Sequence, residues 1–176
     1  MEQVGLTPEV LPADIDEAPT PGEDPVQYVR RLAHDKARSV ALHRPEAVVL
    51  AADTTVDLDG RILAKPVDRD DARRMLSALS ARTHRVHTGV AVHCDGSYHD
   101  LVVTTLVTFV PVAAAMLDWY LDTGEPFDKA GAYALQGAGG VLVDRVQGSV
   151  SNVVGLPLAP TVALLESVGV HLDHVG

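Results

Sequence analysis

The sequence predicts an α/β protein with a single domain, in which a mixed, elongated sheet is flanked by helices. The chain has 176 residues, of which 47% are hydrophobic and 22% are charged, so it is long enough to bury a core of its own. Apolar runs rich in Val and Leu alternate with segments in which apolar residues recur at helical spacing. No internal repeat or low-complexity linker divides residues 1–176, which favours one domain.

The composition restricts the partners that the protein is expected to have. The formal net charge is −10, which argues against nucleic acid or an anionic membrane as a partner. A small phosphorylated ligand stays possible, because a few clustered lysines can outweigh the overall sign. Met1–Gly5 lacks the features of a signal peptide, and the uncharged stretch Leu101–Leu117 is broken by Pro111. With one cysteine and no candidate membrane span, we expect a cytoplasmic protein.

The apolar run Ala47–Ala52 is followed directly by Asp53. An unbroken run of this kind is typical of a strand buried on both faces. In open α/β sheets, ligands bind at the carboxyl ends of such strands, so we expect Asp53 to lie at the end of its strand, next to a ligand. Thr54–Leu63 then predicts a hairpin, because Asp59-Gly60 is a strong type I′ turn signal.

A helix is predicted just before this strand. Glu23 or Asp24 provides its N-cap and Pro25 its first residue. Lys36 falls on the apolar stripe of this helix, where two interpretations are open. The ordinary one is a lysine whose stem lies along apolar surface while its charge stays in water. The other is an ammonium group held inward to meet an anion.

The remaining chain predicts further strands and helices. The expected elements are a short strand at Glu9–Leu11, a helix capped by Asp68, strands at Arg85–His93 and Tyr98–Val110 around a turn, a helix at Val112–Thr123, a strand at Val141–Val146 and a helix near Pro160–Val168. The histidines of these strands lack the spacing of a metal site, so we expect them at the surface or at a sheet edge.

Carboxylates and lysines together suggest metal-assisted phosphate chemistry. Acidic side chains hold Mg²⁺, and lysines neutralise phosphate oxygens. Asp53 with Lys36 and Lys65 would suit this chemistry, and Asp128 with Lys129 offers a further charged pair. The ordinary alternative is that these charged residues form solvated faces.

Ordered motifs along most of the chain strengthen this inference. They are Asp14-Ile15-Asp16-Glu17, Asp35-Lys36-Ala37, Ala52-Asp53-Thr54, Ala64-Lys65-Pro66, Thr88-Gly89-Val90, Asp128-Lys129-Ala130-Gly131-Ala132-Tyr133, Gln136-Gly137 and Ser151-Asn152-Val153-Val154-Gly155-Leu156-Pro157. In this order they resemble the Maf family of nucleoside triphosphate pyrophosphatases, which is related in fold to the inosine triphosphate pyrophosphatases. The resemblance implies house-cleaning hydrolysis of a nucleoside triphosphate to the monophosphate and pyrophosphate. It also implies a divalent cation, Mg²⁺ or Mn²⁺, and a homodimer.

The resemblance further implies roles for individual residues. Asp53 is the expected proton acceptor that activates water, and Glu17 is expected to help Asp53 hold the metal. Lys36 and Lys65 are expected to bind the triphosphate.

Thr54 and Gln136 match positions that set base choice in the family branch that acts on dTTP and UTP. The amide of Gln136 offers both a donor and an acceptor, which complements thymine or uracil. The same amide would serve equally well to tie down the glycine-rich turn. We expect Asp128 and Lys129 to support the site, and Ser151 and Asn152 to satisfy backbone groups before the last helix.

One departure from the family pattern is plain. Family members open with a strand and a Ser-Ala-Ser-Pro-x-Arg-like loop, and Met1–Leu6 instead resembles the end of the helix that follows that loop. The chain is therefore expected to be truncated at its N-terminus relative to the family. Either its start is assigned too late, which we favour because the other motifs are intact, or the protein is catalytically impaired. In the second case a binding or regulatory role in cell division is the alternative function.

Overall fold

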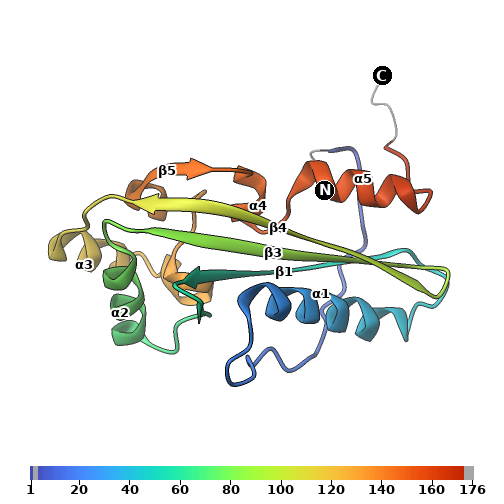
Figure 1. Ribbon diagram of the computed structural model, residues 1–176, viewed down its shortest axis with the longest axis horizontal. Coiled ribbons are helices and arrows are strands. Elements are labelled where there is room, and N and C mark those ends of the chain that lie inside the picture. Colours follow the sequence, from blue (N-terminus) through green and yellow to red (C-terminus); the bar gives the residue numbers. More distant parts are fainter. Residues whose placement is uncertain (2–3, 173–176) are drawn as a thin grey trace.

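In the computed structural model, which describes residue 1 and residues 4–172, the chain forms one five-stranded sheet flanked by helices (Figure 1). The strands are β1 (Val49–Leu58), β2 (Arg61–Leu63), β3 (Thr83–Cys94), β4 (Ser97–Phe109) and β5 (Val143–Gln147). The helices are α1 (Pro25–Ala41), α2 (Arg69–Leu79), α3 (Ala114–Asp122), α4 (Val150–Val154) and α5 (Leu158–Ser167), with short 3₁₀ turns η2 (Glu125–Asp128), η3 (Ala130–Ala132) and η4 (Ala138–Leu142).

The strands follow the order β2-β1-β3-β4-β5, and every pairing among them is antiparallel. The expected α/β fold with a long sheet between helices is confirmed, although the described strands form an antiparallel rather than a mixed sheet. The β1–β2 hairpin turns at Asp59 and Gly60, whose φ angles of 56° and 80° fit the predicted type I′ turn. No helix in the described ranges is long and apolar enough to cross a membrane.

Asp53 lies in the middle of β1 and not at its end, which corrects the prediction from the apolar run. The strand continues because Thr54, Thr55 and Val56 are β-branched residues that favour extended backbone. Asp53 pairs with Gly89 and Thr54 with Thr88 of β3. Neighbouring side chains of a strand point to opposite faces, so Asp53 and Thr54 lie on different sides of the sheet.

Helix α1 covers one face of the sheet, and α4 and α5 lie on the other side (Figure 1). The α1 N-cap is Asp24, whose side chain accepts hydrogen bonds from the backbone N–H groups of Val26 and Gln27, as the sequence predicts. Gly89 lets α1 approach closely, because a Cβ atom at this position would lie 2.4 Å from the carbonyl oxygen of Val29.

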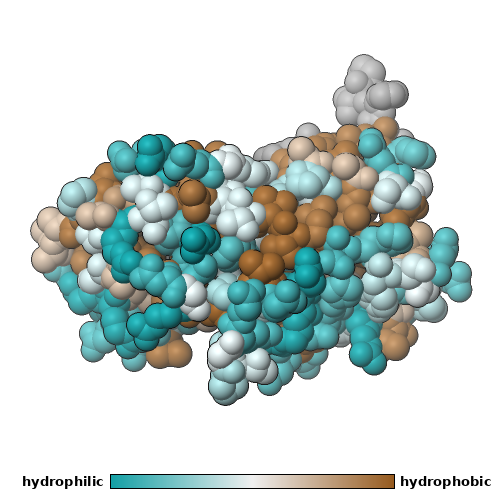
Figure 2. Space-filling view, in the orientation of Figure 1, coloured by the Kyte–Doolittle hydropathy of each residue, from teal (hydrophilic) through white to brown (hydrophobic). Residues whose placement is uncertain are grey.

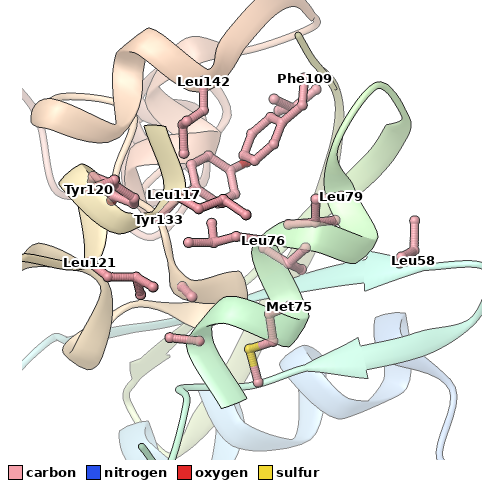
Figure 3. Packing of buried hydrophobic residues seen from close by; sticks show 14 of the residues in the cluster. Leu58, Met75, Leu76, Leu79, Phe109, Leu117, Tyr120, Leu121, Tyr133 and Leu142 are labelled. Carbon is pink, nitrogen blue, oxygen red and sulfur yellow. The ribbon is translucent and has the colours of Figure 1, made fainter. Parts of the chain in front are cut away.

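The largest hydrophobic cluster joins the face opposite α1 to α2, α3 and the 3₁₀ turns. Figure 3 shows Leu76 and Leu79 of α2 directed toward the ring of Tyr133 and its neighbours. The rings of Phe109 and Tyr133 meet edge to face, with their centroids 4.8 Å apart. This cluster fixes the segment that contains Tyr133 against the sheet.

Two local predictions are wrong. Glu9–Leu11 forms no strand, and residues 6–20 contain no helix or strand. His87 and His93 are buried instead of lying at the surface, because the central strand β3 is covered on both faces. The surface of the molecule carries both polar and apolar areas. Figure 2 shows hydrophilic residues along α1 and a hydrophobic area in the middle of the same view.

Candidate functional site

The centre of the site is an ammonium group held between two carboxylates. Lys36 Nζ lies 2.6 Å from Asp53 Oδ1 and 2.7 Å from Glu17 Oε1. Only 10% of the Asp53 side chain is exposed, and 20% of the Lys36 side chain. Lys36 is therefore directed inward and not into water as the ordinary interpretation has it, because its position on the apolar stripe of α1 turns it toward β1.

The environment changes the proton affinity of all three groups. Burial raises the pKa of Asp53, although the hydrogen bond from Lys36 opposes this rise. The hydrogen bond from Lys36 lowers the pKa of Glu17. Burial disfavours the charged form of Lys36, but the hydrogen bonds to Asp53 and Glu17 outweigh burial and raise its pKa. The result is a charged lysine beside a carboxylate with raised basicity.

Two side chains of α1 position the segment that carries Glu17. The Tyr28 hydroxyl donates a 2.8 Å hydrogen bond to the backbone oxygen of Glu17. Arg31 donates to the backbone oxygen of Ala18 and also forms a two-pronged ion pair with Glu23. Glu17 thus reaches Lys36 from an irregular segment that α1 itself ties down.

The other predicted charges lie at the margin of this centre. Lys65 Nζ is 3.7 Å from Glu17 Oε2, and 63% of its side chain is exposed. Lys129 donates a 2.8 Å hydrogen bond to its neighbour Asp128, and this bond lowers the pKa of the Asp128 carboxyl. A backbone hydrogen bond from Gly131 to Ala64 joins the two segments, so Lys65 and the Asp128–Lys129 pair are held near each other.

Thr54 lies on the opposite face of the sheet from Asp53. Its hydroxyl lies 2.8 Å from that of Thr88 and 3.4 Å from the backbone oxygen of Gly155. Asn152 fixes this corner, because its side-chain amide donates to the backbone oxygen of Val86 and to Thr105. Ser151 Oγ accepts a hydrogen bond from the backbone N–H of Leu158 at the start of α5, as predicted, whereas Asn152 bonds to β3 and β4 and not to backbone groups before the last helix.

Gln136 lies in an exposed turn between η3 and η4, and Tyr133 and Ala138 on either side of it pack into the cluster on the face of the sheet that carries Thr54. No contact among the described residues joins its side chain to Asp53 or Lys36. The structure therefore brings together Glu17, Lys36, Asp53 and Lys65, and leaves Gln136 and Thr54 on the far side of β1.

The edge of β1 connects the two sides. Within the described ranges, residues 49–55 have no paired strand on the side away from β3, since β2 begins to pair only at Val56. A groove of about 720 Å³ follows this edge, and its lining includes Glu17, Lys36, Ala52 and Leu156. Asp53 and Thr54 are not among the residues that line this groove, but they directly follow its lining residue Ala52 in β1.

These carboxylates suit a hard cation. In the part of the chain that the structure describes, no three His, Cys, Asp or Glu side chains come together as a metal site. Asp53 and Glu17 nevertheless converge on one cationic group, and carboxylate oxygens are the ligands that Mg²⁺ prefers. Mg²⁺ commonly takes one or two carboxylates and completes its shell with substrate phosphates and water, so this donor pair fits.

The fold and the site define an α/β protein with a carboxylate–lysine centre suited to a polyanionic ligand. A family model described as Maf-like protein matches residues 1–168. The chain is 56% identical to the dTTP/UTP pyrophosphatase of Anaeromyxobacter dehalogenans, over 95% of this chain and 86% of that protein. It is 53% identical to that of Myxococcus xanthus (98% and 87% covered) and 47% identical to that of Chromobacterium violaceum (98% and 89% covered). The chain belongs to the Maf family.

Sequence reasoning missed two groups that shape the site. Tyr28 and Arg31 carry no motif and differ from other helix residues only in the contacts that α1 makes with the Glu17 segment. Glu125, which directly precedes the Pro126 segment, anchors the turn that contains Gln136. No spacing rule identifies either group, because both depend on tertiary contacts.

Proposed function

We propose that this protein is a nucleoside triphosphate pyrophosphatase that hydrolyses dTTP, UTP or modified pyrimidine triphosphates to the monophosphate and pyrophosphate. The observation that carries the proposal is the buried Asp53 carboxylate hydrogen-bonded to Lys36 beside Glu17. The names of the relatives at 47–56% identity support the substrate class.

Asp53 acts as the base in this proposal. Its Oδ1 accepts the hydrogen bond from Lys36, which leaves Oδ2 to take a proton from water. The water oxygen attacks the α-phosphorus, and the bond from that phosphorus to the bridging oxygen breaks to release pyrophosphate. The raised pKa of Asp53 makes it a stronger base than an ordinary exposed aspartate.

The lysines neutralise the triphosphate. Lys36 is fixed, whereas the exposed Lys65 is free to turn toward phosphate oxygens, and Asp128 with Lys129 supports this margin. Glu17 and Asp53 would hold a divalent cation, Mg²⁺ or Mn²⁺, which when bound stabilises negative charge on the phosphates.

Thr54 and Gln136 recognise the base in this proposal. Both lie on the face opposite Asp53, so a nucleotide lying across the β1 edge places its phosphates on one side and its base on the other. The Gln136 amide supplies the donor and the acceptor that the edge of thymine or uracil requires.

The test is product analysis with dTTP and Mg²⁺. We expect dTMP and pyrophosphate in equal amounts, and we expect Asp53→Asn to lower kcat/KM by about 10² to 10⁴. Asp95→Asn, in an exposed turn, is the matched control and should keep normal activity. Release of free phosphate would indicate a general phosphatase, and the absence of any product would favour the binding or regulatory role.

A further inference from the structure

The turn that contains Gln136 is held by a single carboxylate. Glu125 Oε2 accepts a 2.8 Å hydrogen bond from the backbone N–H of Ala138, and Oε1 accepts a 2.9 Å bond from that of Gly139. Tyr120 donates a third hydrogen bond, 2.8 Å long, to Oε1. One side chain thus fixes the backbone directly after Gln136.

The same network reaches the backbone before Gln136. The Tyr120 hydroxyl also accepts a 3.2 Å hydrogen bond from the N–H of Ala134. Tyr120 is fully buried in the hydrophobic cluster shown in Figure 3, so the network is anchored in the core. Gln136 lies midway between the two tethered points, two residues from Ala134 and two from Ala138.

The glycines of the turn fit this network closely. A Cβ atom on Gly137 would lie 1.9 Å from Glu125 Oε2, and one on Gly139 would lie 2.6 Å from the Tyr120 hydroxyl oxygen. Both glycines therefore leave room for the side chains that bind the backbone. Burial opposes ionisation of Glu125, but the hydrogen bonds from Gly139, Tyr120 and Ala138 outweigh it and lower the pKa of this carboxyl.

We propose that Glu125, supported by Tyr120, is a positioning residue that sets base selectivity by holding the Gln136 turn in one place. This inference rests on the proposed function. An amide discriminates thymine from cytosine only when its donor and acceptor are held in register with the base edge, since the two bases present opposite patterns. A mobile turn would let the amide shift to serve either base.

The test compares dTTP with dCTP in Glu125→Gln. The new amide replaces one accepting oxygen by a donor, which faces an N–H group and cannot bind it. We expect the ratio of kcat/KM for dTTP to that for dCTP to fall at least about tenfold, toward its value in Gln136→Ala. The kcat/KM for dCTP should not fall, because the phosphate side is untouched and the released amide can also serve cytosine. Glu166→Gln, an exposed residue of α5, is the matched control.

Amide hydrogen exchange of residues 134–140 supplies a readout independent of activity. We expect faster exchange there in Glu125→Gln, with unchanged exchange in α1. A folded Glu125→Gln protein with unchanged selectivity, or with unchanged exchange, overturns the inference. If the wild-type protein turns over no nucleotide but Glu125→Gln still speeds amide exchange at residues 134–140, the proposed function is overturned. The structural role of Glu125 in holding the turn is then retained. If Glu125→Gln fails to fold, Tyr120→Phe should show a smaller loss of selectivity of the same kind. Unchanged selectivity in Tyr120→Phe would then overturn the inference.

Discussion

Lys36 shows how one residue sets the chemistry of two others. Its ammonium group is shared by Asp53 and Glu17, two carboxylates that would otherwise repel each other. A lysine in this position favours the ionised form of both acids, although one of them is largely buried.

Lys36→Met is therefore expected to raise the pKa of Asp53 further, because the hydrogen bond and charge that lower it are lost while the charge of Glu17 remains. The acid limb of the profile of kcat/KM against pH should move to higher pH. Arg38→Met, an exposed position on the same helix, should leave the limb in place. An unmoved limb in Lys36→Met would show that another group controls the ionisation.

His84 is a buried residue outside the site whose ionisation affects stability. Its Nε2 lies 2.8 Å from the Tyr133 hydroxyl oxygen, and burial lowers its pKa from 6.5 to about 4. At pH values between about 4 and 6.5, His84 is protonated in the unfolded chain but not in the folded protein. Stability is thus expected to fall as the pH decreases from about 7 toward 4.

The contribution of His84 to this loss is about 3 kcal/mol over the full range. His84→Gln should flatten the dependence of the free energy of unfolding on pH, as measured by urea denaturation at a series of pH values. His99→Gln, which changes an exposed histidine, is the control. Equal slopes for wild type and His84→Gln would contradict the assignment.

At the scale of elements, Lys36 of α1 and Asp53 of β1 meet because α1 packs very close to the sheet. Gly89 on β3, which pairs with Asp53, makes this approach possible. Gly89→Ala would push its new methyl group against the backbone of Val29 and move α1 outward, carrying Lys36 away from Asp53.

Gly89→Ala is expected to lower the free energy of unfolding by about 1–3 kcal/mol. We also expect a lower kcat/KM in the protein that remains folded, because Lys36 moves away from Asp53. Chemical denaturation and activity at a temperature where the variant is folded separate the two effects. Thr83→Ala, at the exposed start of the same strand, should change neither strongly. Normal activity in Gly89→Ala would show that α1 tolerates displacement.

The sequence predicts most of these elements, since hydrophobic periodicity, the Asp24 and Asp68 caps and the Asp59-Gly60 turn are local signals. It does not predict that β1 runs past Asp53, because a carboxylate within a strand is stable there only through Lys36 of a distant helix. The sequence also does not predict that His87 is buried, because its burial depends on contacts with Asp57 and Thr104 of neighbouring strands.

For the molecule as a whole, β3 and β4 are long enough to contact α1 and also to contribute residues to the main hydrophobic cluster (Figure 1). The two halves therefore share their central strands, and neither can lose its packing alone. We expect one cooperative unfolding transition.

The single tryptophan, Trp119 in α3, reports on one end of the molecule, whereas far-ultraviolet circular dichroism reports on all elements. The two signals should give the same midpoint in urea. A lower midpoint for Trp119 fluorescence would mean that α3 and its surroundings unfold as a separate unit.

Because Asp53 and Thr54 lie on opposite faces of the sheet, the register of β1 decides which side chain faces Lys36. A strand slipped by one position would replace Asp53 beside Lys36 with Thr54 or with Ala52, depending on the direction of the slip, with its backbone ladder still complete. Insertion or deletion of a single residue between Thr54 and the Asp59-Gly60 turn would thus invert the two sides of the site. A shift by an odd number of residues moves each side chain to the opposite face, and a shift by an even number keeps it on its own face.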